Sequence, residues 1–199
     1  MGLNSTYIIT IEKHQRNSVD VYLRNNCKLN KNQLDSPIMS KDDCMVLILE
    51  VDSCIKKYIR NYYYHGRFSG DYQDQNLEDR IENNQTTIGC VDLSTEEFNN
   101  KLNIKFVCVT SSMSHLFAES TSIRKWFIEL CKFAEAETGI FYCENEYFEL
   151  IWFKNKECHL QVDPETLYDF KFYPEKKPSL EPINDLLNAS FDYAYKHKR

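Results

Sequence analysis

The chain has 199 residues, of which 42% are hydrophobic and 14% aromatic, a composition that is typical of a globular protein and excludes an intrinsically disordered one. Its length suits a single globular domain over residues 1–199 with a sizeable core. The formal net charge of −6 disfavours broad nucleic-acid binding, because a phosphate-binding face needs a surplus of basic side chains.

Neither a secretory signal nor a membrane span is predicted. The first apolar run, residues 7–11, is short and lacks a basic lead-in. The longest apolar stretch, residues 44–49, falls far short of the roughly 20 residues that cross a bilayer. Gly2 lies in a pattern for N-myristoylation, but the polybasic signal that stable anchoring needs does not accompany it. We therefore expect a cytoplasmic protein that binds no membrane.

The N-terminal region is predicted to form a β-hairpin from residues 7–12 and 19–24, both rich in β-forming side chains. The polar residues 25–37 predict a loop. Ser40 can then cap a long helix near residues 41–63, because apolar residues recur there at steps of three and four. These residues are Cys44, Ile48, Val51, Ile55, Tyr58, Ile59 and Tyr62.

The middle of the chain opens with a long polar loop at about residues 66–87. A loop of this length is either functional or a disordered excursion, and the sequence favours neither. Residues 86–91 predict a short strand. Ser94 and Glu97 then match a capping box, which predicts a short helix to about Leu102.

Residues 104–154 predict a central strand–helix–strand–strand unit. Its strands are expected at residues 104–110, 140–143 and 147–153, and its helix at residues 122–138, ended by Gly139. One face of this helix is apolar, with Ile123, Trp126, Phe127, Leu130, Cys131 and Ala134.

Two further elements are expected after this unit. Residues 158–162 predict a strand, and Ser179 can cap a C-terminal helix. The apolar residues of that helix follow helical spacing, and they are Ile183, Leu186, Leu187, Phe191 and Ala194. Together the elements predict an α+β fold or a mixed-sheet α/β fold.

Reactive groups are present, but no catalytic residue is predicted. Ser111 and Ser112 follow a strand end near His115, a spacing that also suits ordinary helix capping. Cys143 could act with His159, but an apolar strand would raise the pKa of this thiol and leave it inert. A small hydrolase or transferase using these groups is the alternative function.

No metal or cofactor is expected. The five histidines are scattered, no two of the eight cysteines are spaced as C-x-x-C, and neither phosphate-binding glycine motif occurs. Most of the cysteines lie inside apolar runs of a chain with no mark of secretion. We therefore expect reduced and mostly buried thiols.

The strongest electrostatic feature is a run of six glutamates against one lysine, Lys132. These glutamates are residues 129, 135, 137, 144, 146 and 149. A solvated surface would explain them equally well as an acidic docking face for a basic partner. On the second interpretation, the partner-binding residues are Glu135, Glu137, Glu144, Glu146, Glu149 and Tyr147.

The sequence therefore predicts a small acidic protein that acts by binding a protein partner, expected to be basic. An immunity or inhibitor protein that neutralises a toxin is the concrete form of this hypothesis. The sequence leaves the partner's identity and the oligomeric state open.

Overall fold

The structure is a computed structural model that describes residues 5–29, 33–39, 45–64, 81–98, 100–108, 110–143 and 147–162. In these residues four α-helices pack against an eight-stranded sheet in which every neighbouring pair of strands is antiparallel. The fold is therefore α+β, as predicted, and the mixed-sheet alternative is wrong.

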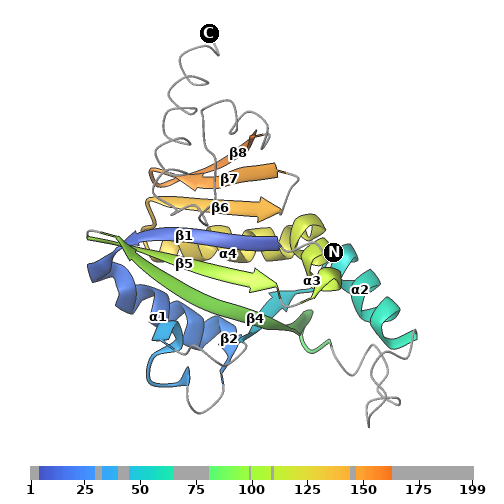
Figure 1. The fold of residues 1–199 in the computed structure, drawn as a ribbon. Helices are drawn as coiled ribbons and strands as arrows, with labels where there is room; N and C mark the ends of the chain where they lie inside the picture. The colour runs from blue at the N-terminus through green and yellow to red at the C-terminus, as the bar shows by residue number, and fades with distance from the viewer. Residues whose placement is uncertain are drawn as a thin grey trace.

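The sheet has the strand order β2-β3-β4-β5-β1-β6-β7-β8 (Figure 1). The strands are β1 (Ser5–Glu12), β2 (Cys27–Lys28), β3 (Met45–Glu50), β4 (Gln85–Phe98), β5 (Lys101–Cys108), β6 (Thr138–Cys143), β7 (Tyr147–Phe153) and β8 (Lys156–Val162). The helices are α1 (Arg16–Asn26), α2 (Ser53–Tyr64), α3 (Ser111–Glu119) and α4 (Thr121–Phe133), with short 3-10 turns η1 (Lys13–Gln15) and η3 (Pro37–Met39).

Strand β1 lies in the interior of the sheet and is hydrogen-bonded along both edges. One edge pairs with β5, from Thr6 opposite Val107 to Glu12 opposite Lys101, and the other pairs with β6. Figure 1 shows β1 between these two strands, with α4 behind them. The strand is buried on both faces, since Tyr7 and Ile8 point to opposite sides and are both buried.

The main core lies between the sheet and the helices. The ring of Tyr7 stacks on Phe127 of α4 with 3.8 Å between ring centroids, and it also contacts Phe117 of α3. Trp126, on the same helix, meets Tyr22 of α1 and Phe106 of β5 edge-on. Such aromatic pairs stabilise a core beyond the area that they bury.

Asp52 caps two helices at once. Its Oδ1 accepts a hydrogen bond from the backbone N–H of Ile55 in α2, at 2.8 Å. Its Oδ2 accepts from the Ser122 N–H and from the Ser120 and Thr121 hydroxyls at the start of α4. Burial opposes ionisation of Asp52, but these donors outweigh it and lower its pKa. One carboxylate therefore joins the N-termini of α2 and α4.

The predicted N-terminal hairpin is wrong, because residues 19–24 lie within helix α1. Val19, Tyr22 and Leu23 are buried at helical spacing, whereas Val21 is exposed. The predicted long helix near residues 41–63 is wrong in its first half. Strand β3 lies there and buries every second residue, namely Met45, Leu47 and Leu49. The helix begins only after Asp52.

Two further boundaries differ from the predictions. The Ser94–Glu97 capping box is wrong, because these residues lie in β4 and pair with β5. Gly139 does not end the helix but lies in β6, where a Cβ atom would stand 2.6 Å from Cys131 Sγ. Helix α4 ends earlier, at Phe133, and is followed by Glu135 in a left-handed conformation.

Strand β7 has the bounds that were predicted, and β5, β6 and β8 overlap their predicted strands. The predicted C-terminal helix and most of the polar loop at residues 66–87 lie outside the described residues, although β4 already begins at Gln85. No helix in the described segments is both long enough and apolar enough to cross a membrane.

We predict that Asp52→Ala lowers the free energy of unfolding by about 2–4 kcal/mol, because two helix caps are lost together. Since the pKa of Asp52 is lowered in the folded state, its stabilisation is complete above the ordinary value of 3.8 and is lost as the pH falls through the folded-state value. Urea unfolding at pH 7 and at successively lower pH should show the difference between wild type and variant shrinking in acid.

Asp35→Ala is the matched control, because Asp35 is exposed and should change stability by less than about 0.5 kcal/mol. An equal effect of the two substitutions would contradict the double cap.

Candidate functional site

The predicted partner-binding residues lie at both ends of β6. Glu135 and Glu137 precede the strand, whereas Tyr147 and Glu149 belong to β7, the strand that follows it. A six-residue strand separates its ends by about 20 Å. Glu144 and Glu146 lie outside the described residues.

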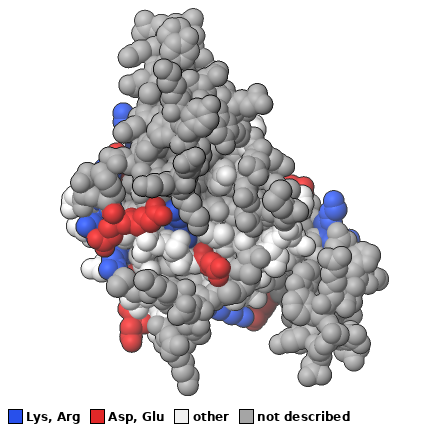
Figure 2. Space-filling model, in the orientation of Figure 1, with Lys and Arg blue, Asp and Glu red and all other residues white. Residues whose placement is uncertain are grey.

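Two of these residues already have contacts within the protein. The Glu137 carboxylate forms an ion pair with Lys101 at 2.5 Å. Tyr147 packs its ring against Phe141, with 5.8 Å between centroids. Figure 2 shows acidic and basic residues of the described part next to one another near the left edge of this view.

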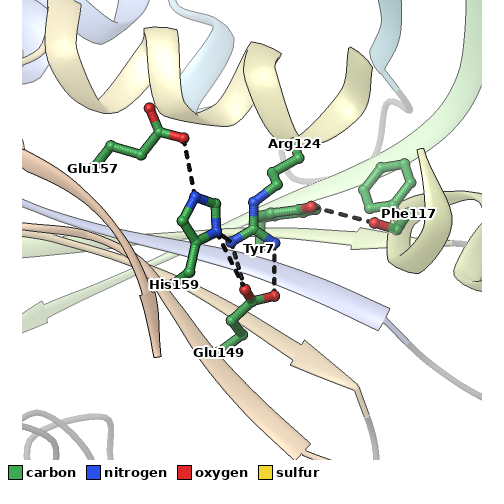
Figure 3. Close-up of polar contacts among 6 residues, drawn as sticks. All are labelled: Tyr7, Phe117, Arg124, Glu149, Glu157 and His159. Atoms are coloured by element: carbon green, nitrogen blue, oxygen red, sulfur yellow. Dashed lines mark hydrogen bonds and ion pairs between the residues drawn. The ribbon is translucent and has the colours of Figure 1, made fainter. Parts of the chain in front are cut away.

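Glu149 is held in a half-buried ion pair with Arg124 of α4 (Figure 3). The Arg124 Nη1 donates to Glu149 Oε2 at 2.6 Å, and Nη2 donates to Oε1. The two side chains are only 22% and 17% exposed. Such a two-point pair in a partly dry environment is stronger than a surface ion pair. It fastens helix α4 to strand β7.

His159 of β8 joins this pair from the edge of the sheet. Its Nδ1 lies 2.8 Å from Arg124 Nη2, and its Nε2 lies 3.4 Å from Glu157. Because Arg124 can only donate, this contact requires an unprotonated Nδ1, which places the ring proton on Nε2, facing Glu157. The histidine thus links α4 to the edge strand.

Tyr7 lies near the same arginine and is hydrogen-bonded to helix α3. Its hydroxyl donates to the Phe117 carbonyl oxygen at 3.2 Å. Burial raises the pKa of Tyr7 far above its ordinary value, and the nearby Arg124 only partly opposes this. Tyr7 thus joins β1 to α3, whereas Arg124, Glu149 and His159 join α4 to β7 and β8.

The candidate nucleophiles lie in different environments. Ser111 and Ser112 are exposed in the first turn of α3, whose N-cap is the preceding Thr110 with its hydroxyl accepting from Met113 N–H. Cys143 is buried, and its Sγ accepts a hydrogen bond from the Ser5 hydroxyl at 3.8 Å. His159, the predicted base, directs its ring nitrogens to Arg124 and Glu157.

The cysteines that the structure describes fully form no disulfide bond, and four of them are buried. These four are Cys27, Cys108, Cys131 and Cys143, whereas Cys54 and Cys158 are half-buried. Burial raises the pKa of Cys27 to about 12. A thiol with such a raised pKa carries little thiolate near neutral pH and is a poor nucleophile.

Exposed apolar side chains of the described residues lie on helix α1 and on the two segments that contact it. The large apolar side chains that are exposed in the described residues are Val21 of α1, Leu34 of the segment that follows it, and Phe133 at the end of α4, at 42%, 55% and 52%. The Phe133 ring lies 5.6 Å from Tyr22, and the Leu34 carbonyl accepts from Arg24 Nε. With 100° of rotation per residue, Val21 lies between Tyr22 and Arg24 around the helix. Val21 is therefore placed between the contact of α1 with Phe133 and its contact with Leu34.

Carboxylates flank these apolar side chains. Glu129 and Phe133 lie four residues apart on one face of α4, and Asp35 directly follows Leu34. Glu135 is exposed and its backbone carbonyl accepts from Gln15 at the start of α1. We call Val21, Leu34, Asp35, Glu129, Phe133 and Glu135 the α1 surface.

Glu135 occupies a backbone position that normally selects glycine. Its φ is 50°, and the hydrogen bonds from Ala136 N to Cys131 O and from Glu135 N to Lys132 O complete a Schellman motif. The left-handed conformation costs a residue with a Cβ atom about 1 kcal/mol relative to glycine. Glu135 therefore lowers the stability of the fold relative to a glycine at the same position.

The acidic run of the sequence contains Glu129 and Glu135, but no pattern indicates the apolar part of the α1 surface. Val21 was placed in a strand, and Leu34 lay in a stretch predicted as a loop. Glu149 was also taken for a surface residue, because nothing in the sequence shows that Arg124, 25 positions earlier, lies opposite it.

Comparison with known proteins adds no functional information: no protein-family model matches the chain, and no significant match is found among curated proteins or solved structures. The function must therefore be argued from the residues themselves.

We predict that a double-mutant cycle with Arg124→Met and Glu149→Met gives a coupling free energy of about 2 kcal/mol or more. Each single variant leaves a half-buried charge without its partner, whereas the double variant removes both charges. The measurement is the free energy of unfolding of the four proteins in urea.

The neighbouring exposed pair of Lys125 and Glu50 is the control, because both side chains are more than half exposed. Its cycle should give less than about 1 kcal/mol. Equal coupling for the two pairs would show that Arg124 and Glu149 do not fasten α4 to the sheet.

Proposed function

We propose that the protein acts in the cytoplasm by binding a basic protein partner through the α1 surface, for example as an immunity or inhibitor protein that neutralises a toxin. The observation that carries the proposal is the grouping of three exposed apolar side chains with three carboxylates around α1. The free, mostly buried thiols are compatible with a reducing compartment.

The apolar part of the α1 surface has the character of an interface centre. Interfaces gain most of their affinity from a few side chains that become fully desolvated, and aromatic residues are frequent among them. Phe133 is half exposed while Tyr22 beneath it is buried, so the ring already rests on a rigid base. A partner that covers Phe133 would need little rearrangement of this surface.

The carboxylates determine the kind of partner that fits. Asp35 and Glu135 are exposed and follow Leu34 and Phe133 closely in the chain. Glu129 is exposed one turn before Phe133, where it lies 3.9 Å from Lys125 Nζ. The whole chain carries a net charge of −6. The guanidinium of Arg24 donates to the backbone carbonyls of Leu34 and Asp35, and that of Arg16 donates to the Ser36 hydroxyl. An acidic rim of this kind attracts a basic partner and accelerates association.

The strained backbone at Glu135 supports the same proposal. Strain that persists in a folded protein is often found at functional positions, where the side chain serves a purpose other than stability. Of the residues predicted to bind the partner, Glu135 is thus the one that the geometry favours. Glu137 and Glu149 are held in ion pairs, and Glu144, Glu146 and Tyr147 stay predictions.

We predict that Glu135→Gly raises the free energy of unfolding by about 0.5–1 kcal/mol and yet slows association with the partner several-fold. Glycine relieves the left-handed backbone, whereas loss of the carboxylate weakens the attraction of a basic surface. The partner would be captured from the native cell with tagged wild-type protein, and binding kinetics would be measured at two salt concentrations.

Lys154→Gly is the matched control, since Lys154 is also left-handed at φ 46° but lies in the turn between β7 and β8. It should stabilise the fold similarly and leave binding unchanged. Unaltered association of the Glu135→Gly protein, together with no salt dependence in wild type, would refute the electrostatic part of the proposal.

We also predict that Phe133→Ala weakens binding at least tenfold with little loss of stability, because half of the ring is already exposed. The double variant Ser111→Ala/Ser112→Ala should keep full binding and biological activity. If the serine variant loses activity while it remains folded and the Phe133 variant keeps it, the hydrolase or transferase alternative would replace the binding function.

A further inference from the structure

The face of the sheet that points away from the helices has two unlike halves. On β4 and β5 it is charged, with Lys105 paired to Glu96 at 2.6 Å. On β1, β6, β7 and β8 it is apolar. This apolar half is a second core cluster, formed by Ile8, Ile140 and Leu150 with Phe148, Phe153, Cys158 and Leu160 packed against it.

The centre of the apolar half is shielded from water. Ile140 and Leu150 are fully buried and Ile8 is 5% exposed. The four described helices all contribute residues to the other cluster, the one that contains Tyr7, and none of them contributes to this one. A sheet face with this composition needs a covering layer, since antiparallel sheets place polar residues on a face that meets water.

The chain itself provides a segment of matching character. Residues 163–199 follow directly from β8, the last strand of the apolar half. Within them Ile183, Leu186, Leu187, Phe191 and Ala194 recur at helical spacing, and Asp185, Asn188 and Asp192 fall on the opposite side. The pattern is that of a helix with one face to bury.

We propose that residues 179–196 dock as an amphipathic helix across the apolar half of this face, with Leu186, Leu187 and Phe191 directed at the strands. Eighteen residues of helix extend about 27 Å and have a diameter of about 10 Å. The four strands from β1 to β8 span roughly 14 Å between their axes. One helix therefore suffices to cover them.

The connection is long enough to allow this docking. Residues 163–178 can span up to about 50 Å when extended, far more than the width of four strands. Their three prolines, Pro164, Pro174 and Pro178, disfavour a continuous helix through the connection. Docking would give the sheet a covering layer on each of its two faces.

Cys158 packs against the apolar cluster, so its accessibility to a thiol reagent measures whether this face is covered. It is half-buried on β8, and burial raises its pKa to about 11, with Arg124 opposing. Its reaction with a thiol reagent is therefore slow while the face is covered. Cys131 belongs to the helix-covered core and reports on global folding in the same sample.

The test is site-resolved mass spectrometry of thiol labelling on the full-length chain. Leu186→Asp/Leu187→Asp places two carboxylates in the docking stripe. Asn184→Asp/Asn188→Asp adds the same charge outside the centre of the stripe. We expect the first variant to label Cys158 at least tenfold faster than wild type and the second less than twofold faster, with Cys131 protected in both.

Equal labelling of Cys158 in the two variants would overturn the proposal. So would protection of Cys158 that rises with protein concentration together with a dimer in sedimentation, because a second copy would then cover the face. If the stripe variant unfolds and exposes Cys131 as well, hydrogen exchange of wild type decides. Protected amides at residues 183–194 support docking, and unprotected amides there refute it.

Discussion

The structure depends on the burial of β1 on both edges and both faces. Its backbone groups are shared between β5 and β6, so neither edge is open to water or to another chain. Tyr7 fixes one face by stacking under α4, and Ile8 begins the apolar cluster on the other. A strand placed in this way requires a layer on each side of the sheet, and the described helices supply one of them.

Several polar groups in the described interior join helices and strands to one another. Asp52 caps α2 and α4 together, and the pair of Arg124 and Glu149 fastens α4 to β7. Buried charges are tolerated when they are paired and hydrogen-bonded in this manner, and removal of one partner is then costly. On the outside, the surroundings of α1 combine exposed apolar side chains with exposed carboxylates, of which Glu129 also lies 3.9 Å from Lys125 Nζ.

Local patterns in the sequence predict the second half of the described fold well and the first half poorly. Strand β7 has the predicted bounds because its β-forming residues are bracketed by turn residues. Helix α1 was taken for a strand because Val19, Val21 and Leu23 alternate, and the exposure of Val21 could not be known. In β3 the first five residues are all apolar, so the sequence does not show that only every second one is buried. Asp52 is a residue type that favours a helix start, but the apolar spacing over residues 41–63 predicted an earlier one.

The candidate site, too, could be predicted from the sequence only in part. The acidity near Glu135 was evident from the sequence, but its combination with Val21 and Phe133 depends on the packing of α1 against α4. The partners of Glu137 and Glu149, Lys101 and Arg124, are distant in sequence and became visible only in the folded chain. Long-range pairing of this kind is a tertiary property that no local pattern encodes.

Residue-resolved native-state hydrogen exchange is the measurement that shows whether β1 is the doubly paired strand on which the helix layer and the apolar sheet face are built. The account predicts that the amides of residues 6–11, those facing β5 and those facing β6 alike, are the slowest to exchange and open only with global unfolding. The amides of the edge strand β8 should exchange faster. Exchange of the β1 amides as fast as those of β8 would contradict the account.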